Sequence, residues 1–354
     1  MKRIITVLLV CLLGAAVLSA FSGCALAQSA PGDGNDRFRV VSTIFPPYDW
    51  VRQILGDDAD NFELSFLTGG GVDLHSFQPS VSDIVRISSS DMFIYVGGHS
   101  DGWVADVLSG AINPDMIVIN LMDVLGDAVH LHAGHHHHHH HHHHSDGEEC
   151  DHPHHSHHHH SHDHHDCDDD ECEHDHHDQD EHIWLSLNFA KTLSTAIANG
   201  LMELDPANAD AFRANLTAYI GRLWVLNAEF EAMVNSSAIR TVLFADRFPF
   251  YYLMRDYGLS HYAAFPGCHA ETEASFTTIV FLINRVNDLG LANILVTESS
   301  DKSIAATIAR DSNGSPQILV LDSMQSITAR DVENGATYLS IMESNLEVLR
   351  EALR

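Results

Sequence analysis

Basic side chains are scarce in this chain. Its 354 residues include 18 Lys and Arg against 49 Asp and Glu, which gives a formal net charge of −31 when the histidines are neutral. Such a charge repels the phosphates of nucleic acids at long range, so the sequence argues against a nucleic-acid partner. Many of the acids lie between His130 and His182, where histidines that titrate near about pH 6.5 would offset them in mildly acidic surroundings.

Apolar side chains are scarce in the same stretch. It holds 26 of the 30 histidines, including the unbroken run His135 to His144, and three of the six cysteines. A segment with so few apolar residues cannot recover an ordering entropy of roughly 1–2 kcal/mol per residue, so we predict a disordered insertion at 130–181. Imidazole with nearby carboxylates binds Zn, Cu or Ni. The alternatives are a solvated spacer or an engineered tag, but the internal position argues against a tag and favours metal binding.

The amino terminus carries an apolar run, Ile4 to Ala20, between two basic residues and several small ones. This pattern predicts a signal peptide, and the run is slightly short for a stable membrane span. Phe21-Ser22-Gly23-Cys24 resembles a bacterial lipobox, which would put a lipid anchor on Cys24, whereas Ala25-Leu26-Ala27 fits simple cleavage. We favour the lipoprotein, with residues 1–23 as signal peptide and 24–37 as polar tether. Either route predicts an extracytoplasmic protein, membrane-anchored or periplasmic.

Outside the insertion, short β-branched runs alternate with segments of helical periodicity. The predicted strands cover residues 39–45, 62–67, 92–96, 116–120, 240–245, 261–265, 293–297 and 317–321. Such alternation predicts parallel strands joined by crossover helices. Between the two sets, an expected N-cap and first-turn proline at Asp205-Pro206 begin almost thirty residues of helical spacing. We therefore predict two α/β lobes, 38–204 and 237–354, joined by a linker helix at 205–236, with a cleft at the strand ends.

Side chains that bind metals follow several predicted strands. His75 follows the strand predicted at 62–67, and His182 precedes Trp184 at the exit of the insertion. Asp246, Glu298 and Asp322 end second-lobe strands. Imidazoles and carboxylates that converge in a cleft suit Zn or Mn, neither of which needs a thiolate. Each signal is weak by itself, because a loop histidine is more often hydrogen-bonded at the surface and an acid after a strand often caps the next helix.

Five ordered motifs resemble the metal-binding, solute-binding subunit of ABC-type zinc and manganese importers. They are Val40-Val41-Ser42-Thr43-Ile44-Phe45-Pro46, Gly71-Val72-Asp73-Leu74-His75-Ser76-Phe77-Gln78-Pro79-Ser80, His182-Ile183-Trp184-Leu185, Phe244-Ala245-Asp246-Arg247 with Tyr257-Gly258-Leu259, and Val320-Leu321-Asp322-Ser323. The resemblance runs from about Arg39 to the carboxyl terminus apart from the insertion, which is itself typical of zinc-specific members. It implies two α/β lobes joined by a rigid helix, one metal in the cleft, and little domain closure.

The resemblance also suggests site residues. His75 matches the first ligand histidine, although Leu74 replaces the usual proline before it, and His182 matches the second. Asp322 matches an acid that some members use from the second lobe. The third ligand histidine is missing, because Asp246-Arg247 holds its place.

Two residues are alternatives for that third ligand. Asp246 could substitute directly, or His269 could reach in from the next loop. His99 is a further candidate, for which we prefer the role of a polar rim residue. Glu273 and Glu298 match family acids that would orient ligand imidazoles, and His261, within a predicted strand, is expected to be structural.

The leading hypothesis is an extracytoplasmic monomer that captures Zn²⁺ and delivers it to an ABC permease. Replacement of one imidazole by Asp246 would shift the preference towards Mn. A metal buffer or a metal-regulated adhesin is the alternative. An enzyme is disfavoured, since no His-Glu-x-x-His occurs and no Pro-Cys-x-x-Cys follows His269-Ala270-Glu271.

Overall fold

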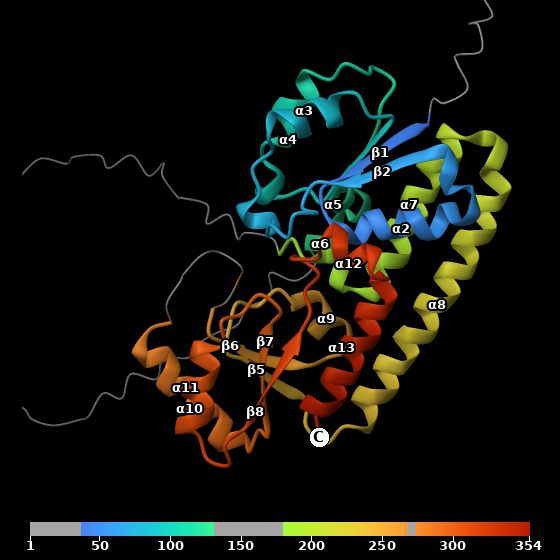
Figure 1. The fold of residues 1–354 in the computed structure, drawn as a ribbon. Helices are drawn as coiled ribbons and strands as arrows, with labels where there is room; N and C mark the ends of the chain where they lie inside the picture. The colour runs from blue at the N-terminus through green and yellow to red at the C-terminus, as the bar shows by residue number, and fades with distance from the viewer. Residues whose placement is uncertain (1–36, 131–179, 266, 268–273) are drawn as a thin grey trace, which may run out of the picture.

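The computed structural model describes residues 37–130, 180–265, 267 and 274–354. Its strands form two four-stranded sheets, ordered β2-β1-β3-β4 and β6-β5-β7-β8, and every pair of neighbouring strands is parallel. Each sheet lies in its own lobe, and one long helix runs beside both (Figure 1). The predicted fold of two parallel-sheet α/β lobes joined by a long helix is confirmed. Within the described residues, no helix has the length and apolar character needed to cross a membrane.

The first lobe is built around the sheet β1 (Phe38–Ser42), β2 (Phe62–Phe66), β3 (Met92–Tyr95) and β4 (Ile117–Asn120). Its helices are α2 (Phe45–Leu55), α3 (Val81–Ser88), α4 (Val104–Ser109), α5 (Leu121–Leu125), α6 (Asp127–His130) and α7 (Leu187–Leu204). The first strand is shorter than predicted, because Phe45 already begins α2 with Pro46 and Pro47 in its first turn. Proline lacks an amide hydrogen, which the first turn of a helix does not need.

The linker helix α8 (Ala209–Ser236) is preceded by a helix that the sequence reading overlooked. This helix, α7, packs along α8 and rests on the first sheet, where a Cβ on Gly200 would come within 2.6 Å of the Met92 side chain. The prediction that Asp205 caps the linker helix is wrong. Asp205 precedes a 3-10 turn, Pro206–Asn208, and its carboxylate accepts the side-chain amide of Asn208 at 2.8 Å instead of a helix amide.

The second lobe repeats the scheme with β5 (Thr241–Phe244), β6 (Ser260–Ala263), β7 (Asn293–Thr297) and β8 (Gln317–Leu321). Its helices are α9 (Tyr251–Asp256), α10 (Phe276–Leu289), α11 (Ser303–Asp311), α12 (Ala329–Glu333) and α13 (Tyr338–Ala352). The bounds of β7 and β8 agree with the predicted strands, and those of β5 and β6 differ by one or two residues. After β8 the chain returns to the first lobe, where the Ala329 amide bonds the Gly69 carbonyl at 2.9 Å.

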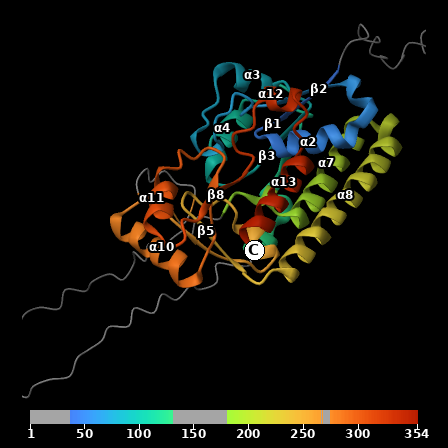
Figure 2. The same cartoon turned by 60° about the horizontal axis from the view of Figure 1, so that its bottom comes forward.

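The largest apolar cluster continues through both lobes. Successive residues of a strand face opposite sides of a sheet, and in β3 and β7 the inward residues Ile94 and Leu295 belong to this shared cluster. Their neighbours Phe93 and Ile294 face outward into smaller, separate clusters under the outer helices. Helix α13 lies beside α8 and packs against α2 of the first lobe (Figure 2). The lobes therefore share one inner core, and each has a smaller outer core of its own.

Candidate metal centre

The first candidate histidine stands on a tight turn after β2. His75 is the middle residue of the 3-10 turn Leu74–Ser76, and the carboxylate of Asp73 accepts its backbone amide at 2.9 Å. The side chain of Leu74 is buried in the shared core and holds the turn in place. The imidazole is thus held at the carboxyl end of the first sheet, the edge at which parallel α/β sheets bind ligands.

The second candidate stands where the chain re-enters the first lobe at Asp180. His182 is only 3% exposed and precedes a 3-10 turn, Ile183–Leu185, whose three side chains are fully buried. The Trp184 indole donates a hydrogen bond to the Ser323 carbonyl at 2.9 Å, which joins this turn to the loop after β8. The carboxylate of Asp180 accepts the His182 backbone amide and lies 2.9 Å from its Nδ1.

The two imidazoles meet through the same ring atom. Nε2 of His75 lies 3.1 Å from Nε2 of His182, although the residues are 107 positions apart. Their Nδ1 atoms face other groups, the Ser100 hydroxyl at 2.8 Å for His75 and Asp180 for His182. A histidine whose Nδ1 has a hydrogen-bond partner presents Nε2 to a metal in a fixed orientation. The pair therefore offers two convergent, pre-oriented donors.

The second-lobe acids Asp246 and Glu298 accept hydrogen bonds from other residues of the second lobe. Asp246 accepts hydrogen bonds from the Thr297 amide and hydroxyl at 3.2 and 2.7 Å and from the Arg247 amide at 2.8 Å. Both of its oxygens are thus engaged, and Oδ2 joins the ends of β5 and β7. Glu298 accepts the amide and hydroxyl of Ser323, each at 2.8 Å, and so shapes the loop that begins at Asp322.

Asp322 itself is half-buried at the start of this loop. Its Oδ1 accepts the Met324 amide at 2.7 Å. Burial, and secondarily the charge of Glu298, raises the pKa of the Asp322 carboxyl to about 6. A cation bound beside Asp322 would favour its ionised form.

The remaining candidates do not join the histidine pair in the described residues. His99 begins a 3-10 turn, His99–Asp101, and its side chain is exposed, whereas the next residue, Ser100, contacts His75. His269 and Glu273 lie outside the described residues, as does Cys24. His261 stacks on Phe248 with ring centroids 3.8 Å apart, in keeping with a structural role. In residues 37–130, 180–265, 267 and 274–354, no three His, Cys, Asp or Glu side chains form a group that could hold a metal ion.

Arg247 occupies the cleft side of the segment that would carry the third histidine. Its guanidinium lies 3.9 Å from the carboxylate of Asp73, two residues before His75. This pair links the second lobe to the turn that carries the first imidazole, and it is long enough to break readily.

Two buried acids that the sequence reading did not single out lie behind His75. Glu181 bonds the Ser100 amide at 2.9 Å, and Asp101 accepts the Gly97 amide at 3.0 Å. Burial, together with the charge of Glu181, raises the pKa of Asp101 to about 7. Glu181 follows an acid-rich tract in the sequence, where no single acid stands out.

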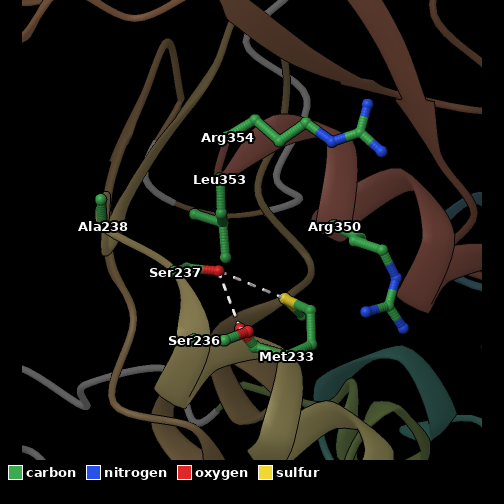
Figure 3. Close-up of a pocket in the computed structure, with 7 residues that line it drawn as sticks. All are labelled: Met233, Ser236, Ser237, Ala238, Arg350, Leu353 and Arg354. Carbon is green, nitrogen blue, oxygen red and sulfur yellow. Dashed lines mark hydrogen bonds between the residues drawn. The ribbon is translucent and has the colours of Figure 1, made fainter.

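A hollow of about 200 Å³ lies at the distant end of α8 and α13, lined by Met233, Ser236, Ser237, Ala238, Arg350, Leu353 and Arg354 (Figure 3). The Ser237 hydroxyl donates to the Met233 carbonyl at 2.8 Å. The two arginines that line the hollow, Arg350 and Arg354, pair with Glu347 and Glu351 of α13, so their charge is already compensated. This hollow contains no histidine and is unsuited to a transition metal.

A comparison with models of protein families identifies the family of this chain. The family model described as zinc-uptake complex component A, periplasmic (ZnuA), matches residues 40–352. The chain belongs to the ZnuA family. The family description agrees with the extracytoplasmic location predicted from the amino terminus.

Proteins similar to this chain have names that refer to zinc. The zinc-binding protein AdcA of Streptococcus pyogenes serotype M3 is 29% identical over 96% of this chain. The chain spans only 60% of the length of that relative. The high-affinity zinc uptake system protein ZnuA of Bacillus subtilis is 24% identical over 95% of this chain and 94% of its own. The Zn(II)-bound ZnuA-like domain of Streptococcus pneumoniae AdcA has the same fold, with a TM-score of 0.64 and 22% identity over 90% of this chain and 99% of that one.

Proposed function

We propose that this ZnuA-family protein captures Zn²⁺ outside the cytoplasm and delivers it to the permease of an ABC importer. The observation that carries the proposal is the convergence of His75 and His182 through Nε2 at 3.1 Å. Two nitrogens that each lie about 2.05 Å from a tetrahedral zinc are about 3.3 Å apart. Insertion of the ion therefore requires a shift of only a few tenths of an ångström.

The rest of the coordination shell is proposed to come from the second lobe. Asp322 is our choice for the third ligand, because the residue after it is tied to Trp184 and Trp184 packs on His182 with ring centroids 5.2 Å apart. Asp246 would first have to give up its bonds to Thr297. His269 is the candidate for the fourth position. His99 is expected to stay at the rim.

Zinc is favoured over manganese by the two imidazoles and by the histidine-dense insertion, both of which suit borderline metals. Elemental analysis of protein purified without added metal tests this choice. We expect zinc as the dominant ion, and manganese as the dominant ion would overturn the assignment.

Titration with zinc in competition with a chromogenic chelator tests the site. His75→Ala and His182→Ala should each weaken one tight site by tenfold or more. The control is His261→Ala, which removes an imidazole stacked on Phe248 and should leave the affinity unchanged. Unchanged affinity in both site variants would refute the proposed cleft.

Deletion of residues 134–178 distinguishes a zinc carrier from a metal buffer. The deletion ends before Asp180, because Asp180 orients His182. A carrier should keep its tight site in the shortened protein. A metal buffer should lose nearly all of its zinc capacity, and that result would favour the alternative function.

Delivery to a permease is tested by zinc uptake in cells that depend on this protein. The His75→Ala variant should fail to restore uptake at limiting zinc, whereas His261→Ala should restore it. Full restoration by His75→Ala would contradict the transport role.

A further inference from the structure

We infer that Glu181 is a positioning residue that fixes the metal-binding tautomer of His75; the inference rests on the proposed zinc site. Glu181 adjoins His182 in sequence, yet its carboxylate serves the other imidazole. Its Oε1 accepts the Ser100 amide at 2.9 Å, and its Oε2 lies 3.8 Å from Nδ1 of His75. The residue is 6% exposed, and within the described residues its buried Oε2 has no hydrogen-bond partner.

The turn before Ser100 is shaped around this carboxylate. Gly98 has a φ of +94°, and a Cβ at that position would lie 2.8 Å from Oε1 and 3.0 Å from Cγ of Glu181. Only glycine adopts this conformation readily and also leaves room for the glutamate. The close approach brings Ser100 within reach of both groups, with its amide on Glu181 and its hydroxyl 2.8 Å from Nδ1 of His75.

The hydroxyl of Ser100 cannot by itself decide the tautomer of His75. It can accept a hydrogen bond from a protonated Nδ1, or it can donate one to a bare Nδ1. A zinc ion on Nε2 requires the proton on Nδ1. The negative charge of Glu181 on the Nδ1 side of the ring favours that proton position, so the lone pair of Nε2 faces His182 and the metal.

Two acids that are adjacent in the sequence therefore orient different imidazoles. Asp180 lies 2.9 Å from Nδ1 of His182, and Glu181 lies behind Nδ1 of His75. Both carboxylates belong to the segment through which the chain re-enters the first lobe. One short stretch of sequence thus orients both convergent donors.

The test is Glu181→Gln in the full-length protein. The glutamine oxygen can still accept the Ser100 amide, while its NH₂ group, at the place of Oε2, favours a bare Nδ1 and hence the wrong tautomer. We expect zinc affinity to fall about tenfold, within the range seen when such supporting groups are removed. In ¹⁵N-edited spectra of the histidine rings, the zinc-free variant should show a weaker Nδ1–H signal for His75 than the zinc-free unmodified protein.

Two further variants keep the test decisive. Ser100→Ala leaves the carboxylate in place but removes the hydroxyl that bonds Nδ1, and it should weaken zinc binding in the same direction even if the glutamine variant folds poorly. Asp49→Asn removes a buried carboxylate from the contact between α2 and α13, away from the histidines, and should leave zinc affinity unchanged.

Wild-type affinity in Glu181→Gln, with the Nδ1–H signal of His75 unchanged, would overturn the inference and leave Glu181 as a support of the turn. The proposed function fails differently. In that case the unmodified protein would lack a tight zinc site, or His75→Ala would retain one. A site that is lost in His75→Ala but intact in Glu181→Gln and Ser100→Ala refutes only the role of Glu181.

Discussion

Asp49 offers the sharpest test of how the two lobes are joined. Its side chain is 0% exposed within α2, and its Oδ2 accepts the backbone amide of Tyr338, the first residue of α13, at 2.9 Å. Its Oδ1 lies 3.4 Å from the side-chain amide of Gln53 and 3.6 Å from the guanidinium of Arg52. Burial raises the pKa of Asp49 despite these partners, so the carboxylate is a costly group whose hydrogen bonds offset its desolvation.

Asp49→Ala and Asp49→Asn should therefore differ in stability. Alanine leaves a buried amide at the start of α13 without an acceptor, and removal of one partner from such a pair costs about 2–4 kcal/mol. Asparagine keeps an oxygen for the same amide and buries no charge, so we expect a change within about 1 kcal/mol of zero. The difference between the two variants should then be at least about 1 kcal/mol.

Urea unfolding of the metal-free protein measures this difference. Tryptophan fluorescence and circular dichroism should report one shared transition, because the inner core continues through both lobes. If asparagine destabilises as much as alanine, the charge of Asp49 matters more than its hydrogen bond and the reasoning is wrong. A loss below about 1 kcal/mol in alanine would show that this connection contributes little.

Three further predictions concern the site and its anchor. Folding raises the pKa of Asp101 from 3.8 to about 7, so its stabilising contribution is full below pH 3.8 and is lost as the pH rises through about 7. The Asp101→Asn variant should remove that loss, which is at most roughly 4 kcal/mol. The melting temperature of the metal-free variant should therefore fall less between pH 4 and 8 than that of the unmodified protein. Trp184→Phe leaves the buried Ser323 carbonyl without its indole donor and should cost about 1–3 kcal/mol in urea unfolding, with zinc affinity reduced several-fold; unchanged values would contradict the proposed link between the two loops. Cys24→Ala should release the protein from the membrane fraction on immunoblots of fractionated cells, and retention there would refute the lipid anchor.

The fold could be predicted where hydrophobic patterning alone determines structure. Strands β7 and β8 are short apolar runs, β7 buried throughout and β8 half-buried at the edge of its sheet, and their ends were predicted to the residue. Helix α7 was missed, although Leu187, Ala190, Leu193 and Ile197 recur at helical spacing on its buried face. The Asp205 cap was wrong because an aspartate-proline pair also begins a 3-10 turn, and the two outcomes differ only in how the following residues pack.

The site was predictable only in part, because some of its contacts depend on tertiary packing. His75 could be singled out because it follows a first-lobe strand, and His182 because it precedes Trp184 at the exit of the insertion; the structure brings their Nε2 atoms to 3.1 Å. The importance of Ser100 and Glu181 depends on one turn closing over one carboxylate. That contact depends on tertiary packing and leaves no periodic signal in the sequence. Asp246 looked available as a ligand in sequence, yet in the structure it joins two strands.

The shared core constrains how the cleft can hold a metal. Opening the lobes by a large hinge motion would expose residues such as Trp184 and Tyr338, both fully buried and joined by a 2.7 Å hydrogen bond from the tyrosine hydroxyl to the tryptophan carbonyl. Exposing two large aromatic side chains costs several kcal/mol, roughly 1.5–3 kcal/mol for each. Under the proposed function, metal capture therefore depends on donors that are already oriented, because a mechanism with large opening and closure would incur that cost. Under the proposed site, small losses of orientation at His75 or His182 therefore reduce affinity, and substitutions at Asp180 or Glu181 should weaken zinc binding although neither residue is a proposed ligand.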